Sequence, residues 1–422
     1  MGMLLIRNAH LIDGETDRMG DLLILDGRIV KIADKLDCPA DETVDVGGCV
    51  VMPGLVDMHV HLRDPGYLYK EDILSGCEAA AAGGVTAVAC MPNTSPVNDN
   101  PEVVDYILLR AKQAKARVYP IASISRRMQG EELTNFSKLR QAGAVGVSDD
   151  GRPVEDRQLM KDALIQAQAS GLLPISHCED LAVIAGGIIN KGRVSEALGV
   201  RGMDRLSEDS ITRREIELAR ETGCPIHIAH VSTAGSVEAI RQAKAEGVRV
   251  TCETCPHYFM LTEDELLKRD ADYRMNPPLR EESDRAAVEA AVLDGTIDCI
   301  VTDHAPHSAA EKADFEKAPN GVVGLETSLA ATLTALYHTG RLTLGEIVRL
   351  MSERPAKLLG VEGGVLREGA AADLAIVDPD EEWTVVPEKL HSKSKNTVFK
   401  GKTLKGKVKM TVLGGEIVFE DR

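Results

Sequence analysis

The stretch VVMPGLVDMHVHLRDPG, residues 50–66, runs from an apolar segment into two histidines, an arginine and a Pro-Gly turn. Because successive side chains of a strand point to opposite faces, His59 and His61 share one face at the end of this strand. Buried strands with polar side chains at their carboxyl ends are typical of α/β barrels. The stretch therefore predicts the first strand of a barrel.

The same pattern of apolar strand, polar loop and amphipathic helix recurs along the chain. Helical stretches such as EDILSGCEAAAAG (71–83) separate the strands, Pro101 fits a first helical position after Asn100, and Gly247 fits just past a helix end. Eight such units over roughly 300 residues predict an α/β fold, a (β/α)8 TIM-like barrel. The strands are expected within residues 50–62, 85–93, 117–125, 144–150, 172–179, 225–232, 248–259 and 298–306.

The sequence pattern at both ends of the chain differs from the strand–helix repeat of the middle. The first residues alternate as strands do, Asp26-Gly27 is a two-residue hairpin signal, and residues 362–422 return to short strands with Gly and Pro turns. Neither end has enough strands to bury a face alone, so we expect the two to form one small β-sandwich beside the barrel. The expected division is 1–51, 52–361 and 362–422.

Composition excludes several classes of function. The 422 residues carry a net charge of −17, which disfavours nucleic acid and anionic membranes as partners. No apolar stretch reaches the roughly 18 residues that a membrane span requires. Nine cysteines do not resemble a disulfide framework, and Cys252 and Cys255 of TCETC are interpreted as small residues of a strand. We therefore expect a cytoplasmic protein.

Imidazoles and carboxylates stand at the ends of several predicted strands. Side chains that converge from separate strands predict a divalent metal site with a position open for water. His227 and His304 are expected on the opposite faces of their strands, away from this site. The candidates are His59, His61, Asp149, Asp150, His177, His230 and Asp303.

The motifs GLVDMHVHLRDPG, MPNT, SDDG, SHCED, HVST, NPPLR and TDHAPH occur in this order over nearly the whole chain. Together they resemble the dihydroorotases of the amidohydrolase superfamily, in the longer bacterial type I class. The resemblance implies a barrel flanked by a β-sandwich, one or two zinc ions with two expected, and reversible interconversion of dihydroorotate and N-carbamoyl-aspartate in pyrimidine biosynthesis. It also implies a homodimer and allows association with aspartate transcarbamoylase.

Site residues follow from this resemblance position by position. Asp150 would bridge the two ions where related enzymes often use a carbamylated lysine, and Asp303 would also be the catalytic base. Tyr258 stands where the family usually has a second histidine, and Asn320 where it commonly has Phe. The implied metal ligands are His59, His61, Asp150, His177, His230 and Asp303. The implied substrate contacts are His61, Arg63, Asn93, Asn276, His307, Asn320 and Gly321.

Two alternatives stay open beside this interpretation. A hydantoinase, dihydropyrimidinase or allantoinase would share the barrel, but Arg63 suits a substrate with a carboxylate, which those rings lack. An inactive dihydroorotase-like partner of aspartate transcarbamoylase would be expected to have lost metal ligands, and this chain retains all six.

Overall fold

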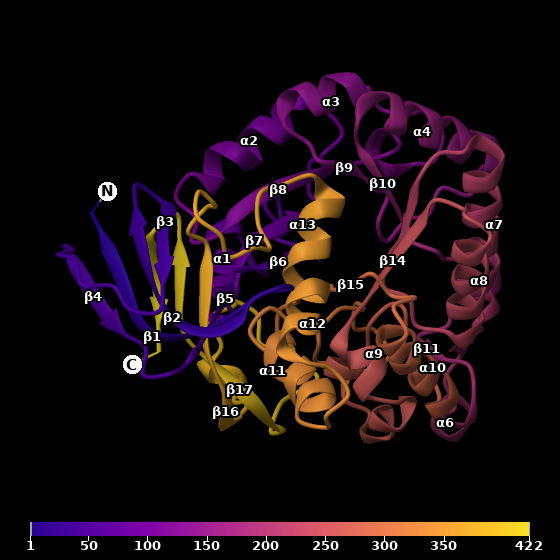
Figure 1. Cartoon of the computed structure of the whole chain (residues 1–422). Coiled ribbons are helices and arrows are strands. Elements are labelled where there is room, and N and C mark those ends of the chain that lie inside the picture. The colour runs from indigo at the N-terminus through magenta and orange to yellow at the C-terminus, as the bar shows by residue number, and fades with distance from the viewer. Residues whose placement is uncertain (1, 422) are drawn as a thin grey trace.

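Residues 2–421 are described here from a computed structural model, in which a ring of helices surrounds one set of strands while a second set forms a flanking domain (Figure 1). Both ends of the chain lie in the flanking domain. The middle of the chain forms the barrel. The predicted combination of a (β/α)8 barrel and a β domain built from both termini is thus confirmed.

The barrel has eight parallel strands in the order β15-β14-β13-β10-β9-β8-β7-β6. A parallel bridge between Val60 and His304 joins the first and last strands, and the His61 amide donates to the His304 carbonyl at 2.8 Å. The strands are β6 (Leu55–Val60), β7 (Val85–Cys90), β8 (Arg117–Ala122), β9 (Gly146–Val147), β10 (Leu173–Ser176), β13 (Ile226–Ile228), β14 (Val250–Thr254) and β15 (Cys299–Ile300).

Sequence explains why these segments form strands. All residues of β6 and β7 are buried, as expected for strands covered by helices on one face and packed in the barrel interior on the other. Several strands are only two or three residues long because the chain turns into loops as soon as it reaches the polar residues at the barrel mouth. The carboxyl ends of all eight strands therefore bring their loops to one face.

Helices pack around the barrel and begin where capping residues allow. Asn100 caps α2 with Pro101 in its first turn, as predicted, and Asp72 forms a capping box with Ser75 at the start of α1. Gly247 follows the end of α8 with φ 78°, also as predicted. The main helices are α1 (Ile73–Ala82), α2 (Pro101–Ala111), α3 (Phe136–Ala142), α4 (Arg157–Ser170), α7 (Leu206–Thr222), α8 (Ala234–Ala245), α10 (Glu282–Leu293), α11 (Ser328–Thr332), α12 (Leu344–Val348) and α13 (Arg354–Leu359).

Insertions interrupt the regular repeat at two places near the barrel mouth. Between β10 and α7 the chain forms α5 (Leu181–Ile184), β11 (Ile189–Asn190), α6 (Arg193–Leu198) and β12 (Gly202–Met203). After β14 it forms α9 (Pro256–Met260) and the 3₁₀ turns η2 (Glu263–Lys268) and η3 (Ala271–Tyr273). Single-turn π segments at Leu333–Tyr337 and Arg349–Glu353 continue α11 and α12.

The flanking domain is one curled sheet in the order β18-β17-β16-β5-β1-β2-β3, with β4 paired to β1. Side chains from both halves of this order, including Leu4, Ile24, Ile376 and Val412, meet in one apolar cluster. The sheet thus folds around its own core. Its strands are β1 (Leu4–Ile12), β2 (Asp17–Leu25), β3 (Arg28–Ala33), β4 (Glu42–Asp45), β5 (Val50–Pro53), β16 (Leu374–Thr384), β17 (Thr403–Leu413) and β18 (Glu416–Glu420).

Several local features of the described chain bear on other expectations from the sequence. Asp26 and Gly27 form the predicted hairpin turn, with φ of 49° and 76°. Within residues 2–421, no helix has both the length and the apolar character that crossing a membrane would require. All nine cysteines are unpaired. The division at residues 51 and 361 stays a prediction.

Candidate metal centre

Six of the predicted ligands lie together at the carboxyl ends of the barrel strands. His59 lies within β6, His61 just beyond it, and the other four follow β9, β10, β13 and β15. All six residues are buried, with none more than 6% exposed. The structure thus brings together residues that are up to 244 positions apart in the sequence, from His59 to Asp303.

Asp150 stands at the centre of this cluster. Its Oδ1 lies 3.4 Å from Nε2 of His59, 3.4 Å from Nδ1 of His177 and 3.5 Å from Nε2 of His230. Its Oδ2 lies 3.4 Å from Nε2 of His61. The ligand atoms form two groups, His59 with His61 and Asp150, and His177 with His230 and Asp150, so the carboxylate is common to both.

Outer contacts fix which ring nitrogen faces the centre. Nδ1 of His61 lies 2.8 Å from the side-chain Oδ1 of Asn93, and Nε2 of His177 lies 3.1 Å from Oε2 of Glu179. A ring nitrogen that donates to such an oxygen leaves the other nitrogen with a free lone pair. The lone pairs of His61 Nε2 and His177 Nδ1 therefore point toward Asp150.

The donor set fits a divalent cation. Nε2 of His59 and Oδ1 of Asp150 are buried without a hydrogen-bond partner in the described chain, and Nδ1 of His177 faces Nε2 of His230 at 2.8 Å. Buried polar atoms normally find partners, so atoms of this kind directed at one point are typical of metal ligands. Imidazole nitrogen and carboxylate oxygen are ligands that zinc accepts.

Electrostatics favour positive charge at the same place. Burial lowers the pKa of His177, but the Glu179 and Asp150 carboxylates outweigh it and raise this pKa to about 10. Burial raises the pKa of Asp150, but the charge of His59 and the contacts with the other imidazoles hold it well below its usual value. Surroundings that stabilise an imidazolium next to a carboxylate also stabilise a metal cation.

Asp303 adjoins the first group of ligands. Its Oδ1 lies 3.1 Å from Nε2 of His61 and 3.5 Å from Nε2 of His59. Asp303 and His230 have φ of 49° and 33°, and Arg63 has φ of 60°. Positive φ is costly for residues other than glycine and is concentrated at functional sites, where neighbouring contacts hold it.

His227 does not lie where the sequence analysis placed it. Its Nε2 lies 3.1 Å from Oε2 of Glu253, whose Oε1 lies 2.5 Å from Nδ1 of His59. The expectation of an opposite face was wrong, because β13 ends at Ile228 and the positive φ of His230 breaks the alternation between the two histidines. His304 does point away, with Gly324 donating to its Nδ1 at 3.2 Å.

Glu253 and Glu179 are the buried acids that sequence reasoning missed. Both contact candidate ligands directly, Glu253 at His59 and Glu179 at His177. A glutamate in the middle of the apolar strand VTCET was an available signal, because an ionised side chain is rarely buried without a partner.

Beside the cluster lies a buried cation. Arg63 is 9% exposed as a residue. Its Nε donates to the Pro306 carbonyl at 3.3 Å, and its Nη2 lies 3.4 Å from Nε2 of His307. In the described part of the chain, no carboxylate forms an ion pair with it. Burial lowers the pKa of Arg63, although Asp303 and Asp150 oppose this. His307 also receives a hydrogen bond from Lys70 at Nδ1, at 3.2 Å.

The other predicted substrate residues line the same mouth. The Asn276 amide donates to Glu179 at 2.7 Å, and the Asn320 carbonyl accepts from Nε2 of His307 at 2.9 Å. Gly321 has φ 142°, and a Cβ there would lie 2.6 Å from the Ala305 carbonyl oxygen, so only glycine fits. The Asn320 side chain instead accepts from Arg274 at 3.2 Å.

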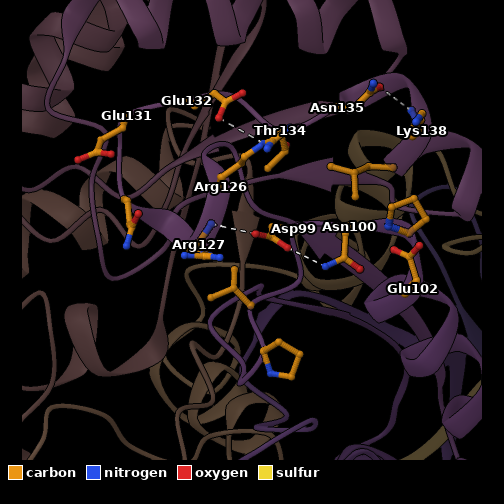
Figure 2. Close-up of a pocket in the computed structure, with 15 residues that line it drawn as sticks. Asp99, Asn100, Glu102, Arg126, Arg127, Glu131, Glu132, Thr134, Asn135 and Lys138 are labelled. Carbon is orange, nitrogen blue, oxygen red and sulfur yellow. Dashed lines mark hydrogen bonds and ion pairs between the residues drawn. The ribbon is translucent and has the colours of Figure 1, made fainter.

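A surface cavity of about 820 Å³ lies elsewhere, between the start of α2 and residues 126–139. Figure 2 shows that side chains of both charges line it, including Arg126, Glu132 and Lys138. None of the predicted site residues is among its lining residues. This cavity is therefore separate from the histidine cluster.

Known structures share this architecture. The L-hydantoinase (dihydropyrimidinase) from Arthrobacter aurescens superposes with a TM-score of 0.89 at 29% identity, over 100% of this chain and 96% of that chain. The barrel, the flanking sheet and the histidine–carboxylate cluster together define a barrel amidohydrolase. The class is an enzyme that hydrolyses cyclic amides.

Sequence relatives identify the family within this class. The dihydroorotases of Geobacter metallireducens and Syntrophus aciditrophicus are each 49% identical to this chain, over 99% of it and 99% of their own lengths. Residues 48–236 match the dihydro-orotase-like family model. The chain belongs to the dihydroorotase family.

Proposed function

We propose that this enzyme is a zinc-dependent dihydroorotase that reversibly interconverts (S)-dihydroorotate and N-carbamoyl-L-aspartate in de novo pyrimidine biosynthesis. The observation that carries the proposal is Arg63, a buried guanidinium without an ion-pair partner among residues 2–421, next to the candidate metal ligands. The relatives named dihydroorotase support the same reaction.

Arg63 suits the carboxylate of dihydroorotate. A guanidinium presents N–H donors in a fork that matches a carboxylate, and a buried charge is costly until such a partner arrives. His307 stays neutral beside it, because burial and the charges of Arg63 and Lys70 lower its pKa to about 2. A neutral imidazole at this place adds no second positive charge beside the guanidinium. We assign substrate contacts to His61, Arg63, Asn93, Asn276, His307, Asn320 and Gly321.

The candidate ligands would hold two zinc ions with Asp150 between them. This assignment rests on the two groups of ligand atoms that share Asp150. When bound, zinc supplies Lewis-acid polarisation of a carbonyl and acidifies water to a pKa of about 7. The proposed ligands are His59, His61, Asp150, His177, His230 and Asp303.

Asp303 would act as the general base and acid of the ring-opening reaction. Its carboxylate adjoins His61 at 3.1 Å, and the contact with that ring and the charge of His59 outweigh burial and keep its pKa below the usual value. An ionised carboxylate at this position can take a proton from the attacking water and deliver it to the departing ring nitrogen. Asn93 would orient His61 through the contact at Nδ1.

The alternatives are less well supported. A hydantoinase or dihydropyrimidinase has the same fold, as the Arthrobacter enzyme illustrates, but its ring substrates would leave the Arg63 cation uncompensated. An allantoinase meets the same objection. An inactive partner of aspartate transcarbamoylase would not need six buried candidate ligands in one cluster.

Cellular setting and assembly complete the proposal. Nine unpaired cysteines suit a reducing cytoplasm. We infer a homodimer, and association with aspartate transcarbamoylase, from the family alone. Sedimentation of the protein with and without that enzyme would test both.

The reaction itself has a direct test. The purified protein is supplied with zinc, its metal content is determined, and ring opening of dihydroorotate and ring closure of N-carbamoyl-aspartate are followed on the same sample. We expect to observe both ring opening and ring closure. Both activities should be lost when zinc is removed by a chelator and restored when zinc is added back. Absence of both reactions in protein that carries two zinc ions would refute the proposal.

A further inference from the structure

A segment of the flanking domain reaches across to the barrel mouth. We call residues 390–399, between η6 (Pro387–Lys389) and β17, the strap. Within it, the Lys393 amide donates to the buried Glu71 at 3.1 Å, and the Ser394 hydroxyl donates to the Lys70 carbonyl at 2.6 Å. The strap is therefore fastened to the loop that follows β6, the loop that also carries Arg63.

Asn396 of the strap contacts the loop on the other side of the mouth. The residue is 4% exposed, and its side chain joins both ends of the loop between residues 307 and 321. The His307 amide donates to Oδ1 at 3.2 Å, and Nδ2 donates to the Gly321 carbonyl at 3.0 Å. The Val323 amide also donates to the backbone carbonyl of Asn396 at 3.0 Å.

These contacts set the spacing of two groups in the mouth. A Cβ on Gly321 would lie 3.0 Å from Cδ2 of His307, so the glycine backbone and the imidazole are closely packed. The side-chain amide of Asn396 therefore fixes the backbone of both His307 and Gly321. Pro306, directly before His307, accepts from Nε of Arg63, so movement of this loop would also displace the guanidinium.

We propose that Asn396 is a positioning residue for the substrate carboxylate, acting from the flanking domain through the backbones of His307 and Gly321. The inference rests on the proposed function for the identity of the substrate. The flanking domain then has a role in substrate recognition, because the buried side-chain amide of Asn396 in the strap contacts the loop of residues 307–321 next to Arg63. The chemistry recognised is a ring carboxylate bound by Arg63, with the His307 imidazole packed beside the guanidinium.

The test uses the zinc-loaded full chain with Asn396→Ala and Asn396→Asp. Asn396→Ala should raise KM for dihydroorotate about tenfold or more, because two buried backbone groups lose their partners and the loop can move. kcat and zinc content should stay within about twofold, since no group that handles the proton or the metal is altered. Asn396→Asp keeps the acceptor for His307 and loses the donor to Gly321, so KM should rise there too.

Lys395→Ala is the matched control. Among residues 2–421, its ammonium donates to the Leu390 and Ser392 carbonyls of the strap and to no group of the barrel mouth, so KM should be unchanged. In an Arg63→Ala background, Asn396→Ala should raise KM by less than about threefold, because a residue that positions the carboxylate site loses most of its effect when the guanidinium is removed.

Several outcomes would overturn the inference. One is a folded Asn396→Ala protein whose KM matches that of Lys395→Ala. Another is a parallel loss of zinc, kcat and thermal stability in both Asn396 variants, or failure of both to fold, since either indicates a purely structural residue. If the wild type opens hydantoin instead of dihydroorotate, the proposed function fails and no ring carboxylate is recognised. If the wild type opens dihydroorotate and Asn396→Ala leaves its KM unchanged, the proposed function stands and the role of Asn396 alone is contradicted.

Discussion

The Glu253 carboxylate lies 2.5 Å from Nδ1 of His59, and both side chains are fully buried within the barrel. Its second oxygen lies 3.1 Å from Nε2 of His227, whose Nδ1 lies 2.8 Å from the Thr251 hydroxyl. Although burial raises the pKa of Glu253, the charge of His59 and the hydrogen bond from His227 lower it to about 2. The ionised carboxylate therefore holds His59 with Nε2 toward Asp150.

Replacing Glu253 should weaken metal binding. Glu253→Gln keeps the shape but removes the charge that orients His59, and outer-shell changes of this kind typically reduce metal affinity about 10–100-fold. Competition with a chromophoric chelator measures the affinity without reference to activity. Glu263→Gln, which alters a buried acid bonded to Asn190, should retain wild-type affinity. Equal affinities for the two variants would contradict the role of Glu253.

Asp150→Ala should lower zinc occupancy at both positions. Each ion loses an anionic ligand, and the repulsion between the two cations is no longer offset. Elemental analysis after dialysis against a fixed free zinc concentration measures the stoichiometry. Loss of one ion with full retention of the other would show that Asp150 serves a single position.

Asp303→Asn should separate proton transfer from metal binding. Asparagine tolerates the positive φ of this position and can offer one oxygen to the metal, but it cannot accept a proton. We expect kcat to fall by about 10²–10⁴ while zinc content falls much less. Steady-state kinetics and zinc analysis on one preparation provide the check. A variant that holds zinc and keeps most of its kcat would exclude Asp303 as the base.

Thiol labelling tests the buried interior of the barrel. Burial raises the pKa of the thiols of Cys90, Cys178 and Cys252 to about 12, and because the thiolate is the reactive form, they should react slowly near pH 8. Cys38 and Cys49 are partly exposed and should react with iodoacetamide first. Peptide mass spectrometry identifies the labelled positions. Rapid labelling of Cys178 in the native protein would contradict this packing.

The sequence was sufficient to predict the barrel and the convergence of its ligands. Strand periodicity placed His59 and His61 on one face, and equivalent positions on other strands placed Asp150, His177 and Asp303 beside them. These inferences need only local alternation and the rule that parallel strands end at one face. Neither depends on the details of side-chain packing.

Contacts that depend on register were not predictable in this way. His227 meets Glu253 because β13 and β14 pair with His227 opposite Thr251, and because the backbone turns at His230. Asn396 reaches His307 only because the strap crosses from the flanking domain, 89 positions further along the chain. Both contacts join segments whose relative placement no local pattern encodes.

The central claim is that Arg63 selects a ring carboxylate beside the candidate metal ligands. The most direct measurement is kcat/KM for dihydroorotate and for dihydrouracil, the same ring without the carboxylate, with wild type and Arg63→Ala. Loss of a charge-assisted pair should cost about 2–4 kcal/mol with dihydroorotate and little with dihydrouracil, so the wild-type preference should largely disappear. A wild-type enzyme that prefers dihydrouracil, or a preference for dihydroorotate that survives Arg63→Ala, would contradict the claim.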